Sequence, residues 1–197
     1  MTIRLAPILH ATAFLLSSFP AVAQDNFLRT LADSTLSLTR QQVIYDPAYF
    51  GIAYPNGDVP PDRGVCTDVI IRAFRKTGID LQKAVYEDMV ANFSQYPRAW
   101  RQKQPDKNID HRRVLNLMTF FTRHGKKLPI TANAADYQPG DIVTWNLGGG
   151  VNHIGIVVNK KSDGGERFMI VHNIGSGQVL ADFLFSYPIT GHFQFGS

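Results

Sequence analysis

A single cysteine, Cys66, lies where a thiol could act as a nucleophile. It follows segment 46–64, which holds four prolines and three glycines, and it precedes an apolar stripe with helical spacing. This pattern predicts that Cys66 starts a helix, where free backbone N–H groups and the helix dipole favour a thiolate and can stabilise an oxyanion. We therefore expect a thiol pKa below about 8.5. The alternative is a small buried apolar residue, and Asp68 favours it because a nearby carboxylate opposes thiolate formation.

A cysteine nucleophile needs a base, and two histidines are suitably placed. His153 opens a β-rich run after a glycine-rich loop, so we expect its ring at the end of the sheet, facing the helices. A hairpin centred on Asp163-Gly164 makes His172 its diagonal neighbour on one face of the sheet. The spacing thus predicts His153 as base and His172 as its orienting partner. A shift of one residue would bring Asn173 to that face instead, as the alternative third residue.

The other histidines and the metal alternative receive simpler interpretations. His111 and His124 are expected to be solvated residues at helix ends, and His192 an ordinary strand residue. Two histidines on one face also fit a metal pair, but no third ligand stands at a recognisable spacing and no HExxH motif is present. We predict neither a metal nor a cofactor.

The elements that must position these residues divide into two halves. Apolar residues recur at helical spacing in the first half, and short β-rich runs separated by glycine turns fill the second. The predicted helices cover about 27–38, 65–74, 81–93 and 110–121, and the predicted strands cover about 142–145, 153–158, 167–172, 179–185 and 191–195. Helices followed by an antiparallel meander predict an α+β fold.

Several of these motifs, in this order, resemble the NlpC/p60 superfamily of papain-like bacterial cell-wall cysteine peptidases and amidases. The matching segments are Tyr54, Gly64-Val65-Cys66-Thr67-Asp68, Pro139-Gly140-Asp141-Ile142-Val143, His153-Ile154-Gly155-Ile156-Val157 and Val171-His172-Asn173. The chain looks closest to the bacterial branch known as domain of unknown function 1287 (DUF1287). It departs from the superfamily where Val65 replaces a frequent Asp and where Thr67-Asp68 replaces Ser-Gly.

The resemblance implies an NlpC/p60 fold, with N-terminal helices packed on a C-terminal antiparallel sheet, and roles for individual residues. Cys66 would be the nucleophile, His153 the base and His172 the third polar residue, with Tyr54 beside the nucleophile to position substrate or oxyanion. The implied activity is a cysteine hydrolase that cleaves an amide bond in the peptide part of peptidoglycan. Two alternatives remain, a catalytically idle wall-binding or scaffold protein of the same fold and an acyl transferase.

The start of the chain and its charge indicate where the protein works. Met1–Ala23 has the pattern of a secretory signal peptide, with Arg4, an apolar run and an Ala-Val-Ala cleavage site. Residues 24–197 are then one domain, located in the periplasm or secreted, without a membrane span. Lys and Arg number 20 against 16 Asp and Glu, with no basic run, which argues against a nucleic-acid partner. The expected partner is peptidoglycan or its peptide fragments.

Overall fold

The first half of the chain supplies helices and the second half supplies the sheet, which confirms the predicted α+β class. The computed structural model describes residues 19–196. In chain order the elements are α1 (Phe19–Leu38), β1 (Ile44–Tyr45), β2 (Arg63–Gly64), α2 (Cys66–Lys76), α3 (Leu81–Asn92), the 3₁₀ turns η1 (Phe93–Gln95) and η2 (Asp110–Arg112), α4 (Val114–His124), β3 (Lys126–Lys127), the 3₁₀ turn η3 (Ala134–Asp136), β4 (Ile142–Asn146), β5 (Asn152–Lys161), β6 (Phe168–His172), β7 (Val179–Ala181) and β8 (Ile189–Gln194). The predicted signal peptide, Met1–Ala23, falls largely outside the described residues. None of the helices within 19–196 has the length and apolar character needed to cross a bilayer.

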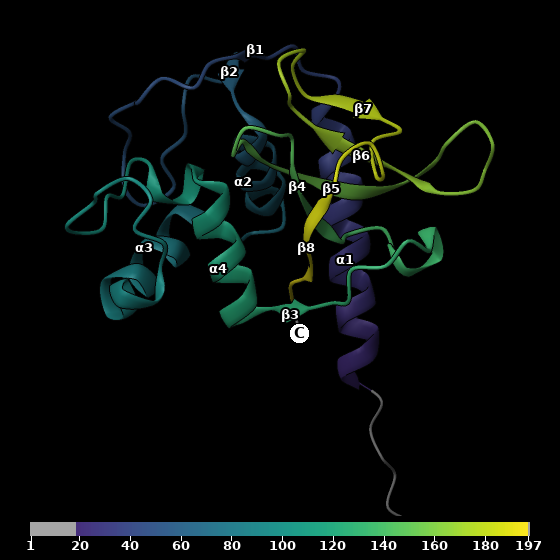
Figure 1. Ribbon diagram of the computed structural model, residues 1–197, viewed down its shortest axis with the longest axis horizontal. Coiled ribbons are helices and arrows are strands. Elements are labelled where there is room, and N and C mark those ends of the chain that lie inside the picture. Colours follow the sequence, from purple (N-terminus) through teal and green to yellow (C-terminus); the bar gives the residue numbers. More distant parts are fainter. Residues whose placement is uncertain (1–18, 197) are drawn as a thin grey trace, which may run out of the picture.

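The sheet has six strands in the order β3-β8-β4-β5-β6-β7. Strands β4 to β7 form the predicted antiparallel meander, but β8 returns to pair with β4 instead of extending it. Helices α1 and α2 pack on β5, and α4 contacts both β5 and β8 (Figure 1). The central strands of the meander therefore lie directly beneath the helix that begins at Cys66.

Two apolar cores, one on each face of the sheet, follow from the alternation of side chains along its strands. On β5, Ile154 and Ile156 point into the larger core, which they share with the helices. The residue between Ile156 and Val158, Val157, points into a smaller core with Trp145 and Phe183. Even-numbered residues of β5 therefore face the helices, and odd-numbered residues face the smaller core.

The hairpin from β5 to β6 has the register that the turn predicts near its base. Ile156 pairs with Val171 and Val157 with Ile170, before a bulge toward the turn. This register places His172 across from Gly155, where an added Cβ would come within 3.2 Å of the His172 Cβ. A glycine at this position therefore leaves room for the His172 side chain.

A buried hydrogen bond between His192 and Asp141 links β8 to the start of β4. The Nε2 atom of His192 lies 2.7 Å from Oδ2 of Asp141, and its Nδ1 atom lies 3.0 Å from the carbonyl oxygen of Pro129. Both ring nitrogens therefore face oxygen atoms of neighbouring residues. The expectation that His192 is an ordinary strand residue is therefore wrong, because burial requires this polar ring to be fully hydrogen-bonded.

Helices α3 and α4 are joined by Asp88, which organises the helical segment beside the sheet. Its carboxylate accepts hydrogen bonds from Tyr96 and from the Arg123 guanidinium, and it also meets His124. His124 is thus at a helix end as predicted, whereas His111 is only 2% exposed. The prediction for His111 is wrong because η2 precedes α4 and turns its ring inward, where burial lowers the pKa to about 4.

Candidate active site

Cys66 is the first residue of α2, as the sequence predicts. Val65 is the N-cap, and its backbone N–H donates to the Asp68 carboxylate at 2.7 Å. The short parallel pair of β1 and β2 brings Tyr45 next to Gly64, two residues before the thiol. The helix start is therefore held from both sides, by Asp68 within α2 and by the loop closure of 46–64.

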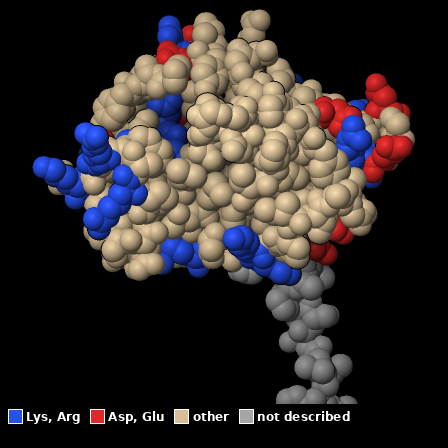
Figure 2. All heavy atoms as spheres, viewed as in Figure 1, with Lys and Arg blue, Asp and Glu red and all other residues tan. Residues whose placement is uncertain are grey.

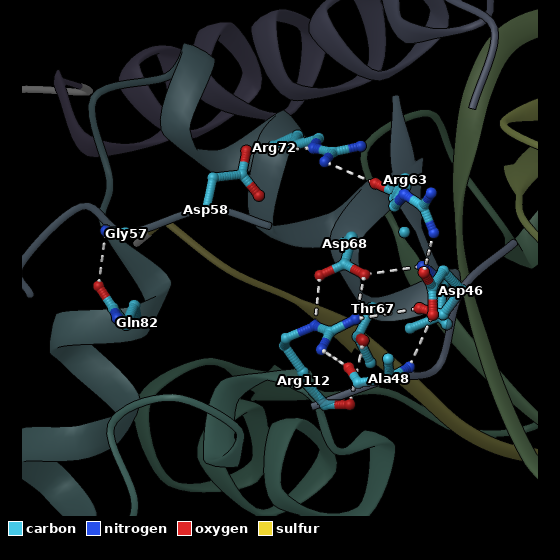
Figure 3. Close-up of polar contacts among 12 residues, drawn as sticks. Asp46, Ala48, Gly57, Asp58, Arg63, Thr67, Asp68, Arg72, Gln82 and Arg112 are labelled. Carbon is cyan, nitrogen blue, oxygen red and sulfur yellow. Dashed lines mark hydrogen bonds and ion pairs between the residues drawn. The ribbon is translucent and has the colours of Figure 1, made fainter. Parts of the chain in front are cut away.

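The charge of Asp68 is matched by a buried partner that the sequence does not reveal. Oδ1 of Asp68 lies 2.9 Å from Nε of Arg112, and Oδ2 lies 3.0 Å from Nη2 (Figure 3). Both side chains are 2% exposed. Arg112 also donates to the carbonyl oxygen of Ala48, and its own carbonyl accepts from the Thr67 hydroxyl. One guanidinium thus ties η2, the loop before β2 and the nucleophile helix together.

The two predicted histidines meet at the point where β5 begins and β6 ends. Nε2 of His153 lies 2.8 Å from Nδ1 of His172, and both rings are buried. Their rings also contact Phe183, and His153 lies near Trp145. The rings therefore point toward the smaller core, so the expectation that His153 faces the helix layer is wrong. His153 falls on the odd positions of β5, whereas the helices cover the even ones.

The thiol reaches this strand end through the backbone. The backbone N–H groups of Ile154, Thr67 and Cys66 lie within hydrogen-bonding reach of the sulfur. Ile154 directly follows His153, so the thiol lies against the backbone one residue from the base candidate, whose ring points to the other face of the sheet. Among the described residues the imidazole of His153 is bonded to His172 and not to the thiol, and such bonds are often long before substrate binds.

Burial controls the protonation of all three groups. It raises the pKa of the Cys66 thiol to about 12, although the backbone N–H of Ile154 opposes the shift. Burial also lowers the pKa of His153 to about 3 and that of His172 to about 4. The predicted lowering of the thiol pKa is therefore wrong, because loss of water outweighs the helix N-terminus. At neutral pH the site holds a neutral thiol beside neutral imidazoles.

The rate of Cys66 alkylation should therefore show no plateau at acidic pH. We expect the rate with iodoacetamide at pH 7 to be at least about tenfold below that of an exposed cysteine, and to rise steadily into the alkaline range. Iodoacetamide labelling followed by mass spectrometry between pH 5 and 10 measures this, with His153→Ala as the control. A plateau at pH 5–7 that disappears in His153→Ala would instead demonstrate a thiolate–imidazolium pair.

Asn173 lies on the face that the predicted register gives it, so the alternative role for it is not realised, whereas Tyr54 lies elsewhere than predicted. Nδ2 of Asn173 donates to the carbonyl oxygen of Gly64 at 3.1 Å, so it holds the loop before Cys66. Its place as the alternative partner of His153 is wrong, because adjacent strand residues point to opposite faces. Tyr54 packs on Tyr86 of α3, with ring centroids 5.2 Å apart.

A cleft with a volume of about 290 Å³ opens beside Cys66, and Tyr45 takes the place predicted for Tyr54. The lining residues are Tyr45, Pro47, Val65, Cys66, Trp100, Ile109, Arg112, Arg113, Val114, Leu115, Gly150 and Asn152. Figure 2 shows a hollow over the N-terminal end of α4, with Lys or Arg side chains inside it. Tyr45 is brought to the cleft by the pairing of β1 with β2, which closes loop 46–64. Strands of two residues leave no recognisable pattern in the sequence, so this pairing could not be predicted.

Comparison with known proteins gives one family, one close relative and several solved structures. The family described as "Domain of unknown function (DUF1287)" matches residues 32–195. The uncharacterized protein YijF of Escherichia coli (strain K12) is 49% identical over 175 residues, which are 87% of this chain and 83% of YijF.

Among solved structures, two of an N-acetylmuramoyl-L-alanine amidase from Bacteroides uniformis ATCC 8492 share the fold. One has a TM-score of 0.54 at 11% identity and covers 87% of this chain and 100% of its own. The other has a TM-score of 0.50 at 13% identity and covers 85% and 97%. A protein of Staphylococcus aureus subsp. aureus Mu50, described as similar to lipoprotein of the NLP/P60 family, has a TM-score of 0.38 at 16% identity and covers 93% of this chain and 46% of its own.

Proposed function

Because the chain belongs to the DUF1287 family and shares its fold with amidase structures, we propose that it is a cysteine hydrolase of a cell-wall amide bond. One observation carries this proposal. The first residue of α2 is a thiol, and it lies at the strand end where His153 and His172 are hydrogen-bonded at 2.8 Å. The proposal assigns Cys66, which lines the cleft, as the nucleophile, His153 as the base and His172 as the acceptor that orients the base.

The proposed reaction is acyl transfer in two stages. If Nε2–H of His153 donates to Nδ1 of His172, Nδ1 of His153 keeps a free lone pair and can accept the thiol proton. The Cys66 sulfur forms a bond to the amide carbon, and the backbone N–H of Cys66 stabilises the oxyanion. His153 returns the proton to the leaving amine as the C–N bond breaks. Water then attacks the thioester, which releases the carboxylic acid and restores the thiol.

The neutral resting state sets the order of proton and bond changes. The pKa of the thiol is raised to about 12 and that of His153 is lowered to about 3. A separate ionisation before substrate binds would therefore be costly. The proton moves to His153 as the sulfur attacks, when charge develops on the substrate oxygen near the backbone N–H groups.

The peptide part of peptidoglycan is the substrate class that we propose. The amidases that share the fold are named for the muramoyl–alanine bond, and the motifs of this chain resemble those of cell-wall peptidases. Incubation of the protein with peptidoglycan fragments, followed by mass spectrometry, tests the proposal. Two products whose masses add up to that of the fragment plus one water indicate hydrolysis, and an amine adduct of the acyl product formed in the presence of added amine indicates an acyl transferase.

A catalytically idle wall-binding protein is the second candidate, and the raised pKa of the thiol favours it. An idle protein would bind the same fragments and leave them intact. A peptide amide probe with a thiol-reactive group distinguishes the two candidates. If the rate of Cys66 labelling at neutral pH falls in His153→Ala, the enzyme is supported. If the rate is the same with and without His153, the idle protein is supported.

The His172 side chain gives a graded test of the orienting role. His172→Ala should lower kcat by about 10²-fold with little change in KM, because His153 loses the acceptor for Nε2–H. His172→Asn should cost about tenfold or less, since its Oδ1 can lie close to the former Nδ1 position and accept the same bond. Steady-state kinetics on peptidoglycan fragments measures both. Equal losses in the two variants would assign His172 a packing role against Phe183.

Export and processing are also part of the proposal. The pattern of Met1–Ala23 supports removal of these residues and action in the periplasm or outside the cell. N-terminal sequencing of the protein recovered from the periplasmic fraction should begin near Gln24. Recovery of the exported protein with Met1 intact would contradict cleavage.

A further inference from the structure

The cleft beside Cys66 carries a guanidinium whose charge is only partly matched. Arg113 lines the cleft together with Trp100, and the guanidinium carbon lies 4.2 Å from the Trp100 ring centroid. Its Nη1 atom is held by Gln102 and by Asp110, the latter at 3.2 Å. The side chain is 18% exposed. Arg113 is thus fixed by a ring on one side and two acceptors at one corner.

The neighbouring arginine shows what a satisfied guanidinium looks like in this cleft. Arg112 uses Nε and Nη2 in a bidentate pair with Asp68, and its Nη1 donates to Ala48. Among the described residues, the hydrogen bonds of Arg113 all leave from Nη1. The Nε and Nη2 edge of Arg113, the edge that Arg112 uses for a carboxylate, is the one left for a ligand.

The carboxylate of Asp110 accepts hydrogen bonds from several donors besides Arg113. Its carboxylate is 1% exposed, and it is shared with the backbone N–H of Asp106 and the side-chain amide of Gln102. A planar fork of N–H donors matches a carboxylate in two parallel hydrogen bonds, and stacking on an aromatic ring leaves its edge available for them. A half-buried, prearranged fork of this kind in a cleft is therefore suited to a carboxylate ligand.

We propose that Arg113 determines specificity by binding a free carboxylate of the substrate, close to the amide that Cys66 attacks. The inference rests on the proposed function of the cleft, and it narrows the substrate to acidic peptides. Apolar residues next to Arg113, Val114 and Leu115, would contact the aliphatic part of the same substrate residue. Amidation of that carboxylate should remove most of the recognition.

The test compares peptidoglycan-derived peptides that carry the free carboxylate with the same peptides after amidation. We expect the protein to prefer the free acid by about 10- to 100-fold in kcat/KM. Arg113→Gln should reduce the ratio of the two kcat/KM values, free acid over amide, to between about 1 and 3. Arg113→Lys keeps the charge without the fork, so it should give an intermediate ratio. Lys103→Gln removes the same charge from an exposed position in the loop that carries Trp100, and it should keep the full preference.

Binding measurements separate this inference from the proposed hydrolysis. Trp100 lines the cleft, whereas the second tryptophan, Trp145, is fully buried and donates to Leu184. Tryptophan fluorescence of Cys66→Ala should therefore report titration with either peptide without turnover. Preference for the free acid that is lost in Arg113→Gln supports the inference even if no peptide is cleaved. Equal binding of acid and amide, or a preference that survives Arg113→Gln, overturns it.

Discussion

Replacement of Cys66 by alanine should abolish turnover, with a loss of at least about 10⁴-fold in kcat. In the proposed mechanism the sulfur forms the covalent bond to the acyl group, and no other cysteine is present in the chain to replace it. The variant should fold, since the change removes one buried atom at the first position of α2. Release of peptides from purified peptidoglycan fragments, followed by mass spectrometry, gives the measurement.

Two further variants test whether the loss is specific to the thiol. Cys66→Ser keeps the size of the side chain but offers a poorer nucleophile, so it should be nearly as inactive. His153→Ala should also be severe, because the thiol and its base act as one unit and their losses do not add. Far-UV circular dichroism and fragment binding should remain unchanged in all three. Full activity in Cys66→Ala would refute the assignment of the nucleophile.

Loss of the Arg112 guanidinium should have the largest effect on stability. Arg112→Met leaves the Asp68 carboxylate buried without its bidentate partner, and an unpaired buried charge costs about 3–5 kcal/mol. That is a large part of the stability of an ordinary domain, about 5–15 kcal/mol. We expect a marked fall in the urea midpoint of unfolding, measured by circular dichroism.

A second variant and a control separate charge from packing. Asp68→Asn combined with Arg112→Met removes the uncompensated charge, so it should recover part of the loss, with an interaction energy of the size that contacting residues show. Arg63→Met breaks the pair with Asp46 in the same region, but Arg63 is 45% exposed in its side chain, so the effect should be much smaller (Figure 3). If Arg112→Met lowers the free energy of unfolding no more than Arg63→Met does, the buried pair does not make the contribution to stability that we predict.

Local patterns predicted the parts of the site that depend on local rules. The helix start at Cys66 followed from a loop rich in proline and glycine and from an apolar stripe. The closeness of His153 and His172 followed from one turn and the period of a strand, since a hairpin fixes its own register. Both features involve residues that are near one another in the chain or joined by one tight turn.

The features that were missed depend on long-range contacts. Arg112 lies 44 residues after its partner Asp68, and neither residue has a sequence signal for the other. Tyr45 was missed in favour of Tyr54 because the parallel pairing of β1 with β2 brings the end of loop 46–64 back beside Tyr45. The predicted shift of the thiol pKa had the wrong direction. The helix dipole can be anticipated from the sequence, but burial of the thiol depends on how the whole chain packs.

The burial of Cys66 has a consequence for the lifetime of the protein. Peroxide oxidises thiolates far faster than thiols, and the path through sulfenic acid to sulfinic and sulfonic acids becomes irreversible. Cys66 is 8% exposed, and burial raises the pKa of its thiol to about 12. With one cysteine in the chain, no second thiol could trap sulfenic acid as an intramolecular disulfide. If Cys66 is the nucleophile that we propose, a thiol that stays protonated until a substrate carbonyl arrives should also resist oxidative inactivation between turnovers.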